Sequence, residues 1–161
     1  MELSTIDAAL TRISAERKKG EAELAAKVQA VQAHEKKVSA MRKTRDERDL
    51  RWKKEEAEVK GERDKLVDRR KALASHTSYK VQQAAEREIE YTSNQLGLRE
   101  TKILQAQAEL EELGAALAKL EEEYTALETQ RNAAEQEMKE TLTNLESRQA
   151  EYETARHALV K

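Results

Sequence analysis

The 161-residue chain has no cysteine, no proline and no phenylalanine, and aromatic residues make up only 3% of it. Without cysteine, disulfide bonds and thiol chemistry are excluded. A globular domain of this length needs more large apolar side chains to fill a three-dimensional core. A disordered chain would contain prolines and would show no regular apolar spacing. These absences leave long helices as the expected structural class.

Charged residues, in contrast, are abundant: they make up 39% of the chain, yet the net charge is only −2. Richness in Ala, Glu, Lys, Leu and Arg without proline is typical of long helices and coiled coils. Residues 1–74 hold 20 Lys/Arg against 15 Asp/Glu, whereas residues 75–161 hold 10 against 17. Because the two halves differ in sign, they attract each other when they lie side by side.

Long apolar segments are also missing. No stretch approaches the roughly 20 apolar residues that a membrane span requires. The opening segment, residues 1–7, has neither the basic region nor the apolar region of a signal peptide. We therefore expect a cytoplasmic protein with no membrane partner.

Apolar residues recur every seven positions in two long series. The first series is Leu3, Leu10, Arg17, Leu24, Val31, Val38, Arg45, Trp52, Val59, Leu66 and Leu73. The second series is Ile89, Leu96, Ile103, Leu110, Leu117, Tyr124, Arg131, Met138, Leu145, Tyr152 and Leu159. A seven-residue apolar repeat sustained over this length predicts coiled-coil helices.

The two series do not share one register. Leu73 and Ile89 are 16 residues apart, so at about 100° per residue one continuous helix would place the two rows on nearly opposite faces. A chain reversal removes this conflict, and the segment between the series is rich in hydroxyl side chains that cap helices, with Thr77 or Ser78 as the expected cap. The predicted turn contains Ser75, His76, Thr77, Ser78 and Tyr79.

The predicted fold is therefore all-α, a long antiparallel two-helix coiled-coil hairpin that forms a single domain. Helix 1 is expected over residues 2–73, the turn over 74–78 and helix 2 over 79–160. At about 1.5 Å per residue the hairpin would form a rod of roughly 110 Å. The alternative is a homodimer of extended chains, about 240 Å long.

A turn centred near residue 76 pairs positions whose numbers add up to about 152–154, and this register predicts ion pairs for the arginines within the apolar rows. The expected pairs are Arg17 with Glu135 and Glu137, Arg45 with Glu109, and Arg131 with Glu21 and Glu23. Such pairs fix a register more than they stabilise it. The same register leaves residues 150–161 beyond the start of the first helix.

Motifs of catalysis are not found. The sequence contains no Gly-rich phosphate loop, no nucleophile elbow and no HExxH motif. His34, His76 and His157 are scattered singly, and the clustered glutamates are expected to form a solvated helix face. The four glycines, Gly20 among them, are expected to be tolerated within the helices. We expect no enzyme activity and no cofactor in this chain.

The half of the first helix nearest the turn is the candidate binding region. Residues 41–71 hold 13 Lys/Arg and 9 Asp/Glu, and they include Trp52, the only tryptophan. A basic tip of this kind suits an acidic protein partner or a nucleic acid, although the interleaved acids repel phosphate. A solvated coiled-coil surface with Trp52 in the core is the alternative. The candidate tip residues are Arg48, Arg51, Lys53, Lys54, Arg63, Arg69, Arg70 and Lys71.

The segment HTSYKVQQAAEREIEYTSNQLGLRETKILQAQAELEEL resembles part of the bacterial coiled-coil hairpin proteins that end in a four-cysteine zinc ribbon. Thr77 and Tyr79 resemble the turn of that family, and Glu88-Ile89-Glu90 resembles its acidic step. The start of the chain is also similar, at Leu3, Ile6-Asp7 and Leu10. The later run is similar at Leu98, Glu100, Ile103, Leu104, Glu109 and Leu113.

The sequence also departs from that family. Ser78 replaces the glutamate of the turn, the spacing from Tyr79 to Ile89 is longer, and the CxxC pairs of the ribbon are absent. Zinc is therefore expected only in a C-terminal ribbon that this chain lacks, so the chain is either truncated after Lys161 or a ribbonless relative.

The resemblance implies a cytoplasmic adaptor or regulator. Its implied partners are the sigma-54 transcription factor, flagellar or type III secretion components, and RNA. Two alternatives from other classes remain open: a stalk or escort component of a flagellar or type III export ATPase, and a nucleic-acid-binding hairpin that uses its basic tip. The active form would be a monomeric hairpin or a homodimer.

Overall fold

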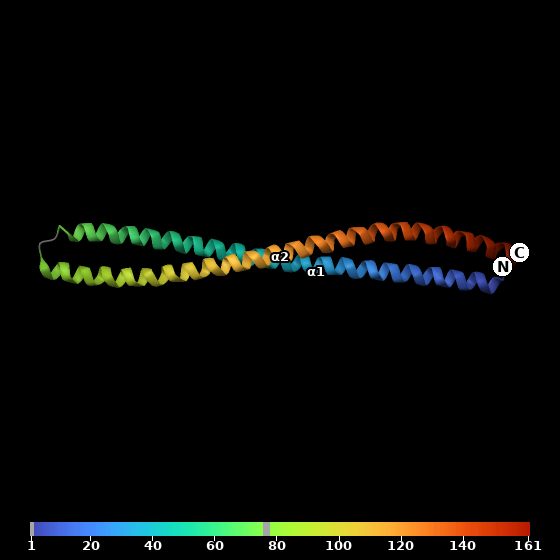
Figure 1. Cartoon of the computed structure of the whole chain (residues 1–161), viewed down its shortest axis with the longest axis horizontal. Coiled ribbons are helices and arrows are strands. Elements are labelled where there is room, and N and C mark those ends of the chain that lie inside the picture. The colour runs from blue at the N-terminus through green and yellow to red at the C-terminus, as the bar shows by residue number, and fades with distance from the viewer. Residues whose placement is uncertain (1, 76–77) are drawn as a thin grey trace. The chain divides into compact units, whose positions relative to one another are not determined.

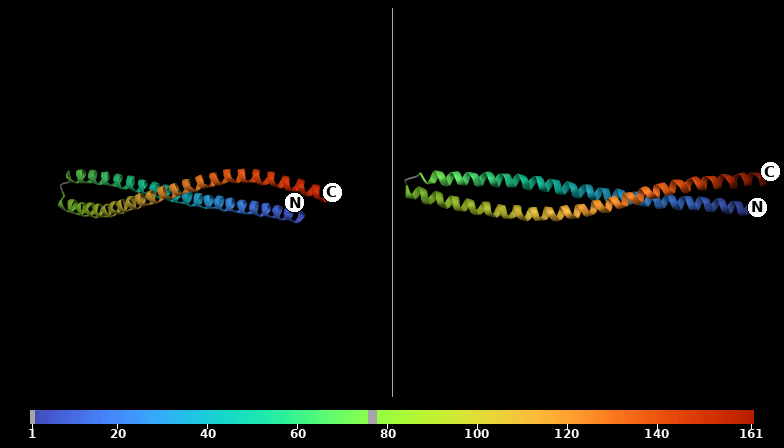
Figure 2. Two further views of the ribbon diagram at one scale, coloured as in Figure 1. Left: turned by 45° about the vertical axis from the view of Figure 1, so that its right-hand side comes forward. Right: turned by 45° about the horizontal axis from the view of Figure 1, so that its top comes forward.

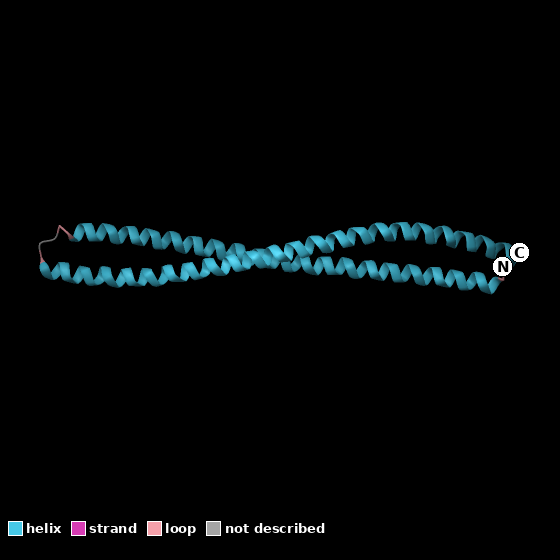
Figure 3. Cartoon of the chain, in the orientation of Figure 1, coloured by secondary structure: helices cyan, strands magenta, loops and turns pink. Residues whose placement is uncertain are grey.

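The computed structural model of the protein describes residues 2–75 and 78–161, and this part of the chain contains two α-helices and no strand (Figures 1 and 3). Helix α1 is Leu3–Leu73 and helix α2 is Tyr79–Val160. Both helices begin and end within one residue of the predicted bounds. The prediction of an all-α helical hairpin is confirmed.

The ends of the helices at the turn are closed by short-range hydrogen bonds. The backbone N–H of Ser75 donates to the carbonyl of Ala72 over 3.2 Å, and its Oγ donates to the same carbonyl over 2.7 Å. These bonds satisfy an acceptor that the end of a helix otherwise leaves free. The carbonyl of Ser78 accepts the N–H of Gln82 over 3.0 Å, which places Ser78 at the N-cap position of α2. The predicted turn residues His76 and Thr77 lie outside the described residues.

The chain divides into two compact units. The turn unit comprises Ser39–Ala118, and the terminal unit comprises Met1–Val38 together with Lys119–Lys161. Each helix contributes one stretch to each unit. The single domain stays a prediction, and its residues pack as these two units.

Within each unit α1 and α2 run antiparallel and side by side (Figures 1 and 2). In the terminal unit Asp7 contacts Arg156, and Glu16, further along α1, contacts Arg148, which comes earlier in α2. Contacts in the turn unit follow the same order. Because both helices belong to one chain, the apolar rows meet within the chain and not between two extended copies.

The predicted apolar rows form the core. In the turn unit Trp52 and Leu73 pack against a cluster of buried residues, which are Val59, Leu66, Ile89, Leu96 and Ile103. In the terminal unit the buried side chains of the rows are Val31, Val38, Met138 and Leu145, and Ile6 and Ile13, which lie three residues after Leu3 and Leu10, are also buried. The ends of the rows are less protected, since Leu3 is 41% exposed and Leu159 is 51% exposed. The repeat therefore predicted which face of each helix is buried.

The glycine at position 20 has a role that its sequence context did not indicate. A Cβ atom at Gly20 would lie 2.7 Å from Sδ of Met138, which is closer than van der Waals contact allows. Nothing lies within 4 Å of the corresponding position at Gly61 or Gly114. Gly20 was predicted to be merely tolerated, but it makes room for a methionine of the opposite helix.

The predicted ion pairs of the row arginines are wrong in their partners. Arg17 contacts Glu21 at 3.0 Å, Arg45 contacts Asp46 at 2.9 Å, and Arg131 contacts Glu128 and Glu135 at 3.7 and 3.8 Å. Each arginine thus pairs with a carboxylate of its own helix. Among the described residues, none of the three pairs with the partners predicted for it. Those partners were Glu135 and Glu137 for Arg17, Glu109 for Arg45, and Glu21 and Glu23 for Arg131.

The register explains this error. The numbers of facing residues add up to 154 for His34 with Leu120, 158 for Gly20 with Met138 and 163 for Asp7 with Arg156. Most of these sums exceed the predicted 152–154, because a seven-residue repeat fixes the buried face of a helix but not how far the helix slides along its partner. The expected overhang of residues 150–161 is also too long, since Arg156 reaches Asp7 at 3.0 Å.

Candidate interaction site on the turn unit

The eight basic residues proposed as a partner-binding tip all lie on α1 in the turn unit, but they do not form one patch. Residues 48, 51 and 69 share one side of the helix at about 100° per residue, whereas residues 53 and 71 point to another side. Three of the eight already have partners. Arg63 contacts Glu100, Lys53 contacts Asp49 at 2.7 Å, and the guanidinium of Arg51 lies 5.3 Å from the centre of the Trp52 ring.

The remaining basic residues make no ion pair among the described residues. They are Arg48, Lys54, Arg69, Arg70 and Lys71. Arg70 lines a groove between the helices, and Arg70 and Lys71 lie in the last turn of α1, where positive charge is favourable. A scattered set of five cations gives no single binding face.

The apolar row of the turn unit has two flanks, each formed by one stripe of mostly polar residues from each helix. Residues seven apart differ by only about 20° around a helix, so each stripe is continuous. The Arg99 flank consists of residues 48, 55, 62 and 69 of α1 and residues 85, 92, 99 and 106 of α2. The Arg63 flank consists of residues 49, 56, 63 and 70 of α1 and residues 86, 93, 100 and 107 of α2.

On the Arg99 flank one guanidinium meets three carboxylates of the opposite helix. Arg99 donates to Glu55 over 2.6 Å and to Glu62 over 2.9 Å, and Glu58 lies at 3.5 Å. The hydrogen bond from Arg99 holds the pKa of Glu55 below its ordinary value, and the bonds to Glu55 and Glu62 raise the pKa of Arg99. This flank is therefore closed by a bridge of charge-assisted bonds.

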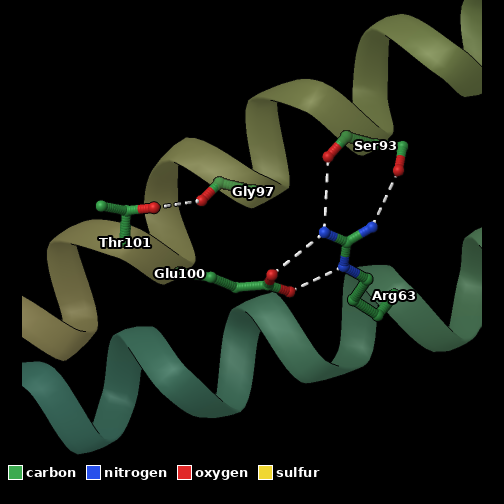
Figure 4. A network of polar contacts seen from close by, with 5 residues as sticks. All are labelled: Arg63, Ser93, Gly97, Glu100 and Thr101. Atoms are coloured by element: carbon green, nitrogen blue, oxygen red, sulfur yellow. Dashed lines mark hydrogen bonds and ion pairs between the residues drawn. The ribbon is translucent and has the colours of Figure 1, made fainter.

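On the Arg63 flank the direction of the bridge is reversed. Arg63 on α1 donates to both carboxylate oxygens of Glu100 on α2, over 2.7 and 3.1 Å, and to Oγ of Ser93 over 2.9 Å (Figure 4). The bidentate bond lowers the pKa of Glu100 and raises that of Arg63. Thr101 turns back to the carbonyl of Gly97 within α2 and takes no part in the bridge.

Three grooves open along the Arg63 flank. The first groove, next to the turn, is lined by Arg70, Leu73, Glu86, Ile89, Glu90 and Ser93, among others. The second is lined by Glu56, Val59, Lys60, Arg63, Ile103 and Leu104, together with Glu100 and Gln107. The third is lined by Arg45, Asp46, Asp49, Gln107, Leu110 and Glu111. Each groove reaches the apolar row from the solvent.

Several large apolar side chains of the turn unit remain exposed after the helices have packed. Leu104 is 66% exposed at the rim of the second groove, and Val67, one turn after Arg63, is 48% exposed. Tyr91 and Leu98 lie seven residues apart on the outer side of α2, and they are 67% and 61% exposed. Tyr91 and Leu98 form one exposed apolar stripe, and Leu104 lies on another side of α2 at about 100° per residue. An exposed apolar stripe of this kind indicates contact with another molecule.

The residues that carry general acid–base or metal chemistry are not gathered. Among residues 2–75 and 78–161, no group of three or more His, Asp or Glu side chains is placed to hold a metal ion. His34 lies in the terminal unit, where its Nε2 is 3.1 Å from the carbonyl of Leu120 and 3.5 Å from Glu123. His157 is exposed near the end of α2. The chain has no cysteine, so it offers no thiolate ligand to a metal ion.

The two arginine bridges were not predicted, although the sequence contains a signal for them. Glu62-Arg63 on α1 and Arg99-Glu100 on α2 have mirrored order, so in an antiparallel pair each acid faces a base on its own flank. Arg63 was predicted as a binding residue, whereas it joins the two helices. Arg99 was not singled out.

None of the known protein families, curated proteins and solved structures compared with the chain matches it. No helix in the described part of the chain is long and apolar enough to cross a membrane.

Proposed function

We propose that the protein is a non-catalytic helical-hairpin adaptor that binds protein partners through its turn unit. The observation that supports this most is the exposure of Tyr91, Leu98 and Leu104, which are all more than 60% exposed on α2 of that unit. When a partner covers these side chains, apolar surface leaves water and the free energy falls. Charged residues elsewhere on both helices keep the uncovered protein dispersed.

A protein partner is favoured over a nucleic acid by the placement of acids among the basic residues. Arg48 and Arg69 share their stripe with Glu55 and Glu62. Binding to nucleic acid relies on cations that neutralise phosphates, and carboxylates in the same stripe repel phosphate. Arg63 and Arg99 are already occupied by carboxylates of the opposite helix.

The resemblance to coiled-coil proteins with a zinc ribbon provides the first partners to test. They are sigma-54 and components of the flagellar or type III secretion apparatus, and the corresponding location is the cytoplasm. An adaptor of this kind links partners by contact alone, so binding and release are its whole chemistry.

Site-specific photo-crosslinking tests the proposal. A photoreactive residue is placed at Leu98 or at Leu104 of the full chain in its native cell, and the matched control carries the same residue at Glu151, an exposed position of the terminal unit. We expect Leu98 or Leu104, but not Glu151, to capture a defined protein that mass spectrometry identifies.

The identity of the captured molecule then decides between functional classes. A sigma factor or a secretion component supports the adaptor, whereas a hexameric ATPase indicates a stalk or escort. Capture of RNA at Leu98 or Leu104, or equal capture at Glu151, contradicts the proposed function.

A further inference from the structure

We propose that the Arg63 flank of the turn unit is a docking trough for one amphipathic helix whose flanking residues are basic. This inference rests on the proposed function and names the chemistry of the partner. Its evidence is the alignment of the three grooves along one flank, their apolar floor and the charge of their rims.

The three grooves follow one line. Their rims contain residues 49, 56, 63 and 70 of α1 and residues 86, 93, 100 and 107 of α2, all spaced by seven. Gln107 lines both the second and the third groove, whereas the bridge from Arg63 to Ser93 and Glu100 crosses the flank between the first groove and the second. From residue 73 to residue 45 the trough spans about 40 Å at 1.5 Å per residue. A helix of about 28 residues has the same length.

The floor of the trough is apolar. Leu73 and Ile89 lie in the first groove, Val59 and Ile103 in the second and Leu110 in the third. Leu104 stands at the rim of the second groove with 66% of its surface exposed. These floor residues belong to the seven-residue rows, so their spacing matches the apolar stripe of another α-helix.

The occupant is a helix and not an extended strand. A strand needs partners for its backbone N–H and C=O groups, and the side of a helix offers no free edge to supply them. A helix satisfies its own backbone and presents only side chains to the floor. Helix-in-groove docking therefore suits this surface.

The excess of acidic residues along the groove rims indicates a basic occupant. Seven acids and four bases line the three grooves, and two of the bases, Arg63 and Arg45, are paired with Glu100 and Asp46. The acids without an ion pair among the described residues are Glu56, Glu86, Glu90 and Glu111. Two of them, Glu56 and Glu111, come from different helices, so Lys or Arg on both sides of a docked helix meets a carboxylate.

The test uses the full chain and two synthetic 28-residue helices labelled with a fluorophore. Both carry Leu in a seven-residue a/d pattern; the first has Lys and the second has Glu at the e and g positions. Binding is followed by fluorescence anisotropy. We expect the Lys helix to bind at least about tenfold more tightly than the Glu helix, because opposite charges across a docked pair discriminate between partners.

Leu104→Gln and Leu50→Gln form a matched pair of variants. Both leucines lie in the turn unit and are exposed to a similar extent, 66% and 72%, but only Leu104 lines the trough. Because neither change alters the charge, we expect Leu104→Gln to weaken binding of the Lys helix about fivefold and Leu50→Gln to leave it unchanged. The double variant Glu56→Gln/Glu111→Gln is expected to reduce the preference for Lys over Glu.

Equal effects of the two leucine variants, or equal binding of the two helices, would overturn the trough. Analytical ultracentrifugation adds a separate check: a dimer that Leu104→Gln dissociates means that a second copy of the chain occupies this flank, and this also overturns the proposal. If crosslinking at Leu98 captures a protein while neither helix binds, the trough is wrong and the adaptor function stands. If the Lys helix binds as expected while crosslinking captures no protein, the adaptor function fails and the trough remains.

Discussion

The two units of the hairpin share one apolar repeat but fix their register by different means. In the turn unit two arginines, one from each helix, bridge to carboxylates of the opposite helix over 2.6–3.1 Å. Among the described residues of the terminal unit, the ion pairs that arginines make between the helices are single contacts, Arg148 with Glu16 at 3.6 Å and Arg156 with Asp7 at 3.0 Å. There Met138 fits over Gly20, and His34 reaches the carbonyl of Leu120.

This difference shows that a seven-residue repeat needs a second source of specificity. An apolar row alone allows one helix to slide along the other by a heptad with little loss of burial. In the turn unit the hydrogen bonds of the two arginines resist sliding, whereas in the terminal unit the fit of Met138 over Gly20 resists it. Four predictions test this contrast, beginning with the largest effect.

Removing a core side chain is expected to have the largest effect. Leu96→Ala in the turn unit and Leu145→Ala in the terminal unit remove leucines that are 1% and 3% exposed. Each is expected to lower the free energy of unfolding by about 2–4 kcal/mol, measured by urea unfolding followed by circular dichroism. The rate of backbone amide hydrogen exchange should rise mainly in the unit that carries the change. A rise spread evenly over both units would mean that the units unfold as one.

The glycines separate helix propensity from packing. Gly61→Ala in the turn unit meets no neighbour, so we expect it to stabilise the protein by about 1 kcal/mol through helix propensity. Gly20→Ala offers the same gain in propensity but forces Met138 to move, so its net gain should be smaller or negative. Thermal unfolding of both variants measures the difference. Equal stabilisation by the two changes would show that the contact between Gly20 and Met138 does not help to fix the register of the helices.

Replacing one bridging arginine tests the role of charge. Arg99→Met keeps the length of the side chain and removes the bonds to Glu55 and Glu62, whereas Arg148→Met in the terminal unit removes a single contact with Glu16. We expect Arg99→Met to lower the melting temperature more, by a few degrees or less, because Arg99 lies at the surface. A larger loss for Arg148→Met would reverse the comparison between the units.

The smallest effect concerns pH. The pKa values of Glu55 and Glu100 are lowered by Arg99 and Arg63, so the unfolded state binds more protons than the folded state near the ordinary value of 4.5. The two bridges therefore contribute stability that is present above pH 4.5 and lost as the pH falls through the lowered values. Melting temperatures between pH 6 and pH 3 should fall less steeply in Glu55→Gln/Glu100→Gln than in the wild type. Parallel curves would show that these carboxylates do not couple to folding.

The helices, the turn and the buried face of each helix could be predicted from the sequence, because these features depend on local signals. The rows from Leu3 and Ile89, and the hydroxyl residues around Ser78, each carry their information within one or two turns of helix. The partners across the helices depend on how far one row slides along the other, which no local pattern fixes. Arg17 and Arg45 were therefore assigned partners of the opposite helix, yet they pair within α1.

The candidate site stays a prediction. The sequence pointed to residues 41–71 of α1 and included Arg63 among the cations for a partner, whereas Arg63 bridges to the opposite helix. Whether a cation is free depends on the opposite helix, and Glu100 and Ser93 come from that helix. The grooves of the Arg63 flank arise only when both helices are in place, so neither row alone could reveal them.

The charged row beside the core of the turn unit also bears on how the chain folds as it is synthesised. Positions 48, 55, 62 and 69 hold Arg, Glu, Glu and Arg. In an in-register parallel pairing of two α1 helices, each of these side chains would face its own copy, and like charges would meet at every position. Helix α1 is complete before α2 leaves the ribosome, and during this interval its charged row opposes pairing with a neighbouring nascent chain. Arg99, which arrives later, supplies the opposite charge that such a neighbour lacks.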